Sequence, residues 1–319
     1  MTRPAQIVAV GEILWDIFPD RQVGLRNSRK TDSLRLEESA SFSEYWSRAG
    51  AAFALGGATY NFCVHASTLG HKVHLLSAVG DDELGARALE QAAGHGLQVQ
   101  VIEGASTGRV TVTVDEEGQP SYKLHRPAAY DEAIWIAPAV EPDWIYFGTL
   151  HQVYEKPRNL TKRLCETYPQ ARCFYDINLR VDSYWKELLW ELLPLADVLK
   201  LNDGEMEELR RFGICKGLDP EKCCTELAET FELEMVCVTR GEHGCAIWQD
   251  GNFVETAGIP TKVVDTVGAG DAFSAAVVHG IQAGWPIERV AEFANRVGAY
   301  VASRRGGTPA LNFEEIERV

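Results

Sequence analysis

The sequence predicts an α/β protein in which a doubly wound, mainly parallel sheet carries helices on both faces, together with a small β lid. Three observations lead to this fold class. From residue 144 onward, short apolar runs alternate with helical patterns of about 10–15 residues, which is typical of a parallel sheet covered on both faces. A hairpin pattern at 109–126 is out of phase with this alternation. A glycine-rich turn at 265–273 leads into a helical run of small residues.

The N-terminal half begins with a buried strand expected at 6–13 and ending at Trp15-Asp16. Residues 20–50 break the pattern, because Arg, Ser and Glu are in excess there, and we expect an insertion with a short helix near 41–48. The Gly56-Gly57 pair opens a helix that ends at Gly70. The pattern then predicts a strand at 72–79, a helix at 81–94, and strands at 98–102, 109–114 and 121–126, the last two joined by a turn at 115–118.

The C-terminal half contains the clearest alternation of strands and helices. Strands are expected at 144–148, 173–176, 198–201, 235–239, 245–248 and 253–256. Helices are expected to end near 168 and 193, and to occupy 204–211, 221–231, 271–283 and 287–303. We therefore expect residues 1–319 to form a single domain, with a projecting lid around 99–130.

The composition limits the functions that the chain can have. A net charge of −15 argues against binding to nucleic acid or to anionic membranes, because both require basic surfaces. The N-terminus lacks the form of a signal peptide, and no apolar stretch approaches the roughly 18 residues of a membrane span. We therefore expect a cytoplasmic protein. Its eight cysteines have no metal-binding spacing, and most are expected to be buried thiols.

The turn at 265–273 has the composition of an anion site. Gly268, Ala269 and Gly270 leave backbone N–H groups free to point into one concavity at the positive end of the following helix. Asp271 would repel a resting phosphate there, but it could take the proton of a hydroxyl that attacks one. An anion hole beside a base is what phosphoryl transfer to an alcohol requires, and we expect the helix terminus to keep Asp271 ionised without an unusual pKa. In the alternative interpretation, Asp271 caps the helix and the glycines only form a tight turn.

Residues 265–273 resemble, position for position, the second signature of the ribokinase-like sugar kinases of the phosphofructokinase-B type. The resemblance implies a ribokinase-like fold, with Asp271 as the general base beside the anion hole of the glycine turn. It runs from about Ile7 to Ala310 in sequence order, and only residues 20–50 are unmatched.

The resemblance also implies a sugar site near the N-terminus. Gly56-Gly57 and Asn61 resemble the family's first signature, in which paired glycines let the backbone approach the sugar and the asparagine binds its hydroxyls. Tyr60 is bulky for its place in that signature. Asp16 corresponds to the family's aspartate that binds sugar hydroxyls, a role that suits a carboxylate.

A third segment completes the implied substrate site. Asp176, Asn178 and Arg180 are similar to the family's Asp-x-Asn-x-Arg, found at the carboxyl end of a strand, where ligands gather in open α/β sheets. Arg180 could supply the positive charge that an acidic protein needs near phosphate.

The nucleotide and ion sites follow from the same resemblance. Asn202 and Glu205 match a pattern that the family uses around Mg²⁺-ATP, with Glu205 acting through water, although the same pattern forms a helix capping box. The implied ATP contacts are Thr239, Gly241, Asn295 and Gly306. Asp265, Val267 and carbonyls near Gly306 correspond to a monovalent cation site, which makes K⁺ a candidate ion.

The expected function is ATP-dependent transfer of phosphate to a primary hydroxyl of a sugar, with fructose first. Ribokinase, 2-keto-3-deoxygluconate kinase and nucleoside kinase remain alternatives, and so does a non-catalytic sugar- or nucleotide-binding regulator on the same fold. A dinucleotide oxidoreductase and a Walker-type NTPase are disfavoured, because their glycine-rich motifs are missing from the sequence. The expected partner is a small-molecule sugar. The hairpin at 109–126 is expected to close over that sugar or to form the edge of a homodimer.

Overall fold

The computed structural model describes residues 3–18, 52–114 and 120–318. The insertion expected at 20–50, with its helix near 41–48, lies outside these residues, and so does the turn expected at 115–118. Among the described residues, no helix is long and apolar enough to cross a membrane.

The main sheet has eight strands in the order β14-β13-β12-β11-β10-β9-β1-β4. Neighbouring strands from β4 to β12 are parallel, and β13 and β14 add an antiparallel edge, so the expected mainly parallel sheet is confirmed. In chain order the strands are β1 Gln6–Val10, β4 Lys72–Leu76, β9 Trp144–Gly148, β10 Arg172–Asp176, β11 Val198–Asn202, β12 Met235–Thr239, β13 Cys245–Gln249 and β14 Asn252–Thr256.

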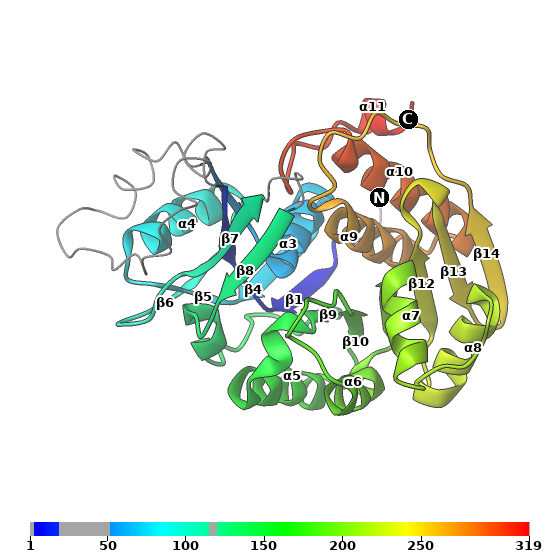
Figure 1. Cartoon of the computed structure of the whole chain (residues 1–319), viewed down its shortest axis with the longest axis horizontal. Helices are drawn as coiled ribbons and strands as arrows, with labels where there is room; N and C mark the ends of the chain where they lie inside the picture. Colours follow the sequence, from blue (N-terminus) through cyan, green and yellow to red (C-terminus); the bar gives the residue numbers. More distant parts are fainter. Residues whose placement is uncertain (1–2, 19–51, 115–119, 319) are drawn as a thin grey trace.

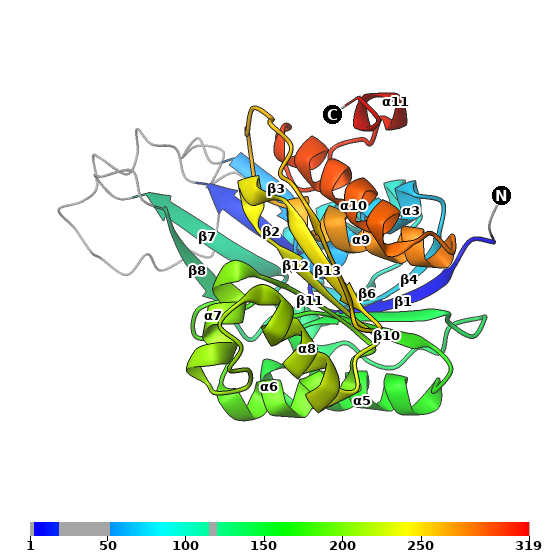
Figure 2. The ribbon, with the colours of Figure 1, turned by 90° about the vertical axis from the view of Figure 1, so that its right-hand side faces the viewer.

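Helices cover both faces of this sheet, as Figures 1 and 2 show. One face carries α5 Glu155–Thr167, α6 Lys186–Leu192, α7 Asp203–Arg211 and α8 Pro220–Phe231, and the other carries α3 Ala58–Thr68, α9 Ala269–Gln282 and α10 Ile287–Ala302. Two further helices, α4 Glu83–Gly94 and α11 Phe313–Ile316, lie at the periphery. Side chains of a strand alternate between these layers: Ile7 and Ala9 join one core, and Val8 and Val10 join the other.

The strand expected at 6–13 was predicted too long, because the chain leaves the main sheet at the end of β1, after Val10. Residues Leu14–Phe18 form β2, which pairs with β3 (Ala52–Gly56) and with β7 (Gly108–Val114) in a second sheet. The turn between β1 and β2 packs so closely on α3 that a Cβ at Gly11 would lie 2.0 Å from Thr59 Oγ1. The strand expected at 72–79 is divided in the same way, into β4 and β5 (Ala78–Gly80).

The second sheet contains the expected hairpin. β7 pairs antiparallel with β8 (Pro120–His125), and the complete order is β3-β2-β7-β8. The sheet projects from the main body beside β1 and α3 (Figure 1). We refer to these four strands as the lid sheet. The predicted lid around 99–130 omitted β2 and β3, whereas β6 (Gln100–Ile102) pairs with β5 instead.

Six of the eight cysteines are free thiols, and five of these are buried, in agreement with the prediction for most of them. Cys215, in the segment after α7, and Cys223 of α8 form a disulfide, which the sequence did not indicate.

A pair of histidines joins the first strand to α9. His71 Nδ1 accepts a hydrogen bond from the Ala5 N–H at 3.1 Å, so its Nε2 carries the proton that points to His279 Nδ1, also at 3.1 Å. Burial, and then the charge of His279, lower the pKa of His71 to about 4. Its neutral ring therefore contributes stability above the ordinary histidine pKa, and this contribution is lost as the pH falls from about 6.5 toward 4.

We expect His71→Gln to flatten the loss of unfolding free energy between pH 6.5 and 4, because glutamine cannot titrate. Urea unfolding of both proteins at several pH values measures the difference. The raised pKa values of buried carboxyl groups act in the opposite direction in both proteins and cancel in this comparison. An exposed-site control, His243→Gln, should keep the wild-type slope. Parallel pH profiles for wild type and His71→Gln would contradict the assignment.

Candidate active site

The glycine turn at 265–270 is held against the C-terminal loop. Gly268 has φ +78° and precedes the first residue of α9. A Cβ at Gly268 would lie 2.1 Å from the Gly307 carbonyl oxygen, so only glycine allows this approach. Asp265 joins the same two segments, because its oxygens accept from the Val267 N–H at 3.1 Å and the Gly306 N–H at 3.0 Å.

Asp271 lies in the first turn of α9, whose N-cap residue is Gly268, and its side chain accepts no capping hydrogen bond from this helix among the described residues. Instead, Asp271 Oδ2 accepts a hydrogen bond from Asn61 Nδ2 at 2.8 Å. This geometry contradicts the interpretation of Asp271 as a helix cap. The carboxyl group is 8% exposed, and it faces the N-terminus of α3.

The electrostatics of Asp271 differ from the expectation of an ordinary pKa. Burial raises the pKa of Asp271 to about 7, and the charge of Asp176 acts in the same direction. The Asn61 hydrogen bond and the charges of Lys200 and Arg180 oppose this rise. The helix terminus is therefore outweighed by desolvation, and the carboxyl group changes its charge near neutral pH.

Asn61 is placed by the glycine pair that opens α3. Gly57 has φ +101°, and a Cβ at Gly56 would lie 3.3 Å from Asp16 Oδ2 and 3.7 Å from Asn61 Oδ1. Asn61 Oδ1 is buried without a hydrogen-bond partner among the described residues. Gly56, Asp16 and Asn61 thus lie close together, and the oxygen of Asn61 leaves a buried acceptor there.

Asp16 comes from the lid sheet rather than from the end of the first strand. It lies in the middle of β2, opposite Ala54 of β3 and Val110 of β7. Burial raises the pKa of Asp16 to about 6, while the charge of Arg180 lowers it and that of Asp265 raises it. Arg180 is exposed and makes no ion pair with the described residues, so its guanidinium is available beside Asp16.

The side chain of Asp176 is too deeply buried to make the expected contact with a sugar. Its side chain is 0% exposed, and its oxygens accept from Lys200, Ser274 and Tyr146. The strand end that carries Asp176 is covered by α9, so this carboxylate is closed to a sugar. Asn178, two residues later, has φ +36° and leads the chain toward Arg180.

The Asn202 and Glu205 pair forms a reciprocal capping box at the start of α7. Glu205 N–H donates to Asn202 Oδ1 at 3.0 Å, and Asn202 N–H donates to Glu205 Oε2 at 2.8 Å. Glu205 Oε1 accepts from the Leu179 N–H at 2.8 Å. Burial raises the pKa of Glu205, whose side chain is engaged by backbone groups, so it fits contact with a cation only through water.

Of the remaining expected nucleotide residues, Thr239 and Gly241 lie at the end of β12. Thr239 pairs with Asn202 across β11 and β12, and Gly241 follows with φ +54°. Asn295 donates from α10 to the Ala257 carbonyl at 2.8 Å. Within the described part of the chain, no hydrogen bond links Thr239, Gly241 or Asn295 to Asp271.

Sequence reasoning missed two charged residues at the centre of this region. Glu12 is 3% exposed and accepts from the Ala58 N–H at 2.9 Å, so it caps α3 from the β1–β2 turn. Burial raises the pKa of Glu12. Lys200 is 5% exposed within β11. Both are charged residues inside apolar runs, and that is the signal by which the sequence could have revealed them.

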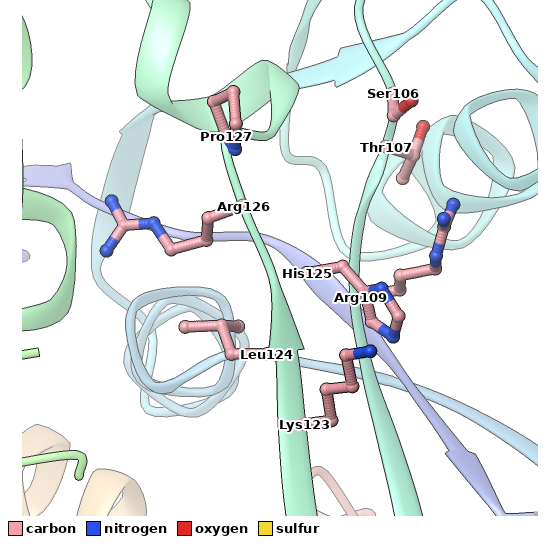
Figure 3. A pocket seen from close by; sticks show the side chains of 8 residues that line it. All are labelled: Ser106, Thr107, Arg109, Lys123, Leu124, His125, Arg126 and Pro127. Atoms are coloured by element: carbon pink, nitrogen blue, oxygen red, sulfur yellow. The ribbon is translucent and has the colours of Figure 1, made fainter. Parts of the chain in front are cut away.

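A hollow of about 280 Å³ lies on the lid sheet, lined by Ser106, Thr107, Arg109, Lys123, Leu124, His125, Arg126 and Pro127. Figure 3 shows Arg109, Lys123 and His125 on one side of the two strands, with Leu124 and Arg126 directed to the other. Because Asp16 is opposite Val110, it faces away from Arg109 and His125. The side chains of Arg109, Lys123 and His125 that line the hollow therefore point away from Asp16.

Known carbohydrate kinases match most of this chain. The model of the pfkB family of carbohydrate kinases matches residues 48–313. The chain is similar to a fructokinase of Escherichia coli, with 28% identity over 275 residues that cover 80% of this chain and 88% of the relative. It is also similar to a 2-dehydro-3-deoxygalactonokinase of Haloferax volcanii, with 27% identity over 289 residues that cover 84% and 87%.

Among solved structures, the fold is similar to that of an Escherichia coli protein crystallised in complex with ATP and Mg²⁺. The TM-score is 0.74 and the sequence identity 20%, over 98% of each chain. Since the family model matches most of the sequence, the chain belongs to the pfkB family of carbohydrate kinases. It is therefore an enzyme rather than a non-catalytic regulator.

We expect Glu12→Ala to destabilise the protein by about 1–3 kcal/mol, because it leaves the buried Ala58 N–H without its acceptor. Glu12→Gln keeps an acceptor oxygen and should lose less. Urea unfolding measures both effects, and amide exchange at residues 57–61 should be faster in Glu12→Ala. Equal stability of the alanine and glutamine variants would contradict the capping role.

Proposed function

We propose that this member of the pfkB family of carbohydrate kinases transfers the γ-phosphate of ATP to a primary hydroxyl of a sugar. Fructose is the first candidate for that sugar. The single observation that supports it most is the Asn61–Asp271 hydrogen bond beside the Gly268–Gly270 turn. It joins a residue expected to hold the sugar to a carboxylate at the positive end of a helix.

The proposed reaction needs a base and a place for negative charge. The sugar oxygen attacks the γ-phosphorus and forms a new P–O bond, while the bond to the bridging β,γ-oxygen breaks and ADP leaves. Asp271 takes the proton of the attacking hydroxyl, which requires its ionised form. N–H groups of the glycine turn at the α9 terminus stabilise the charge on the transferred phosphoryl group.

The sugar would lie between the lid sheet and α3. Asp16 and Asn61 supply acceptors for its hydroxyls, and the absence of a Cβ at Gly56 and Gly57 lets it approach the backbone. The exposed guanidinium of Arg180 lies toward Asp16 and can face the phosphate. Closure of the lid sheet over the sugar would exclude water, which competes as a phosphate acceptor.

ATP would lie along the ends of β11 and β12, between Asn202, Thr239 and Gly241 on one side and Asn295 and Gly306 on the other. The similar Escherichia coli structure with ATP and Mg²⁺ supports this nucleotide and ion. Mg²⁺ would neutralise charge on the phosphates, with Glu205 contacting its hydration shell. Asp265, Val267 and Gly306 converge at the turn, and we propose K⁺ as the monovalent ion there.

The choice of fructose rests on the relatives named fructokinase. The similarity to a 2-dehydro-3-deoxygalactonokinase keeps acidic keto-sugars as the second candidate class, for which the cation of Arg180 would be the natural partner. A homodimer through the lid sheet, a cytoplasmic location and one domain over 1–319 are further parts of this proposal.

A panel of free sugars with ATP, read by ADP release, tests the reaction. We expect turnover with fructose, and a fall in kcat/KM below about pH 7, since Asp271 of the free enzyme must lose its proton. Asp271→Asn should lower kcat by about 10²- to 10⁴-fold with ATP binding intact. Near-normal turnover of the folded variant would remove the base assignment, whereas turnover with another sugar would change only the substrate.

Asp16→Ala should raise the sugar KM strongly and change the ATP KM little, because charged hydrogen bonds to the sugar hydroxyls are lost. The rise corresponds to about 2–3 kcal/mol of lost binding free energy. Sugar and ATP titrations with a melting curve measure this. The exposed Glu90→Ala is the control and should alter neither constant. A change in ATP KM alone would show that the orientation of the site is wrong.

A further inference from the structure

A buried ion pair lies directly behind the glycine turn. Lys200 of β11 donates to Asp176 Oδ1 at 3.0 Å, with the two side chains 6% and 0% exposed. Asp176 Oδ2 accepts from Ser274 at 2.9 Å and from Tyr146 at 3.2 Å. All these groups lie in the protein interior, where screening by water is weak and a charge acts strongly on its neighbours.

The pair contacts the turn through Gly270, the residue before Asp271. A Cβ at Gly270 would lie 3.0 Å from Lys200 Nζ, so the ammonium group packs against the backbone of the anion site. The hydroxyl of Ser274, one helical turn later, is also 3.0 Å from the Gly270 carbonyl oxygen. Movement of the pair would therefore move the turn.

The groups that face Asp271 come from five parts of the fold. Asn61 of α3 donates a hydrogen bond, and Asp176 of β10 is a like charge. Lys200 of β11 and Arg180, after β10, are opposite charges. The fifth is Tyr146 of β9, whose pKa is raised well above its usual value by burial first and also by Asp176 and Asp271, so it stays neutral.

We propose that Lys200 and Asp176 form a positioning pair that balances the charge at the glycine turn. Lys200 stabilises the ionised form of Asp271 and the phosphate beside Gly270. Asp176 holds Lys200 in place, and its negative charge limits how strongly Lys200 stabilises the ionised form of Asp271. This inference rests on the proposed role of Asp271. Although burial opposes it, the carboxylate of Asp176 raises the pKa of Lys200, which keeps its charge.

An electrostatic pair and a merely structural pair predict different results. Removing the cation leaves Asp271 beside the like charge of Asp176 with less opposite charge to offset it, which makes deprotonation of Asp271 harder. Removing the negative charge of Asp176 leaves Lys200 facing Asp271 alone, which makes deprotonation easier. If the pair were merely structural, both variants would be less stable than wild type, and the proton affinity of Asp271 would stay unchanged.

The experiment compares Lys200→Met, Asp176→Asn and the double variant in the full chain. The pH dependence of kcat/KM and the ¹³C NMR titration of the Asp271 carboxyl carbon in the ligand-free protein are both measured. We expect the midpoint to move up by about one pH unit or more in Lys200→Met, and down in Asp176→Asn. The double variant should return toward wild type, because the opposite charges are removed together.

The matched control is the second buried ion pair, Arg126–Asp131, whose side chains are 10% and 2% exposed. Asp131→Asn should cost stability without moving the midpoint of Asp271. Midpoints that shift in the same direction in both single variants, or that stay unchanged in folded proteins, would overturn the inference. If the carboxyl titration shifts as expected but kcat/KM does not follow it even in wild type, the base assignment fails and the pair's electrostatic role stands.

Discussion

The hydrogen bond between Asn61 and Asp271 depends on two helix N-termini meeting at one edge of the main sheet. The two residues are 210 positions apart, on α3 and α9, which lie on the same face of the sheet. Because the parallel strands present their carboxyl ends at one edge, the end of β11 with Lys200 and the segment with Arg180 that follows β10 converge there too. The chemistry of the site is thus a consequence of strand direction.

Close backbone approaches make this meeting possible. A Cβ at Gly307 would lie 2.9 Å from Asn61 Nδ2, and one at Gly268 would overlap the Gly307 carbonyl. Glu12 completes the arrangement from the β1–β2 turn by capping α3. The substrate turn, the base and the C-terminal loop are therefore fixed against one another by contacts that tolerate no additional side-chain atoms.

Burial then sets the charges of the site. Asp16 and Asp271 both have pKa values raised by desolvation, to about 6 and about 7. In a chain with net charge −15, positive charge must be supplied locally, and Arg180 and Lys200 supply it in different ways. Arg180 is exposed to a ligand, whereas Lys200 is buried and acts through its position beneath the glycine turn.

The sequence by itself determined the alternation of strands and helices, the hairpin at β7 and β8, and the glycine turn before α9. These features depend on local periodicity and on residues such as Gly268 that favour one backbone conformation. Only the tertiary structure decided that Asp16 comes from the lid sheet and that Asp176 forms a buried ion pair with Lys200. It also decided that the pKa of Asp271 is raised to about 7. Burial and pairing between distant segments control these properties, and no local pattern contains them.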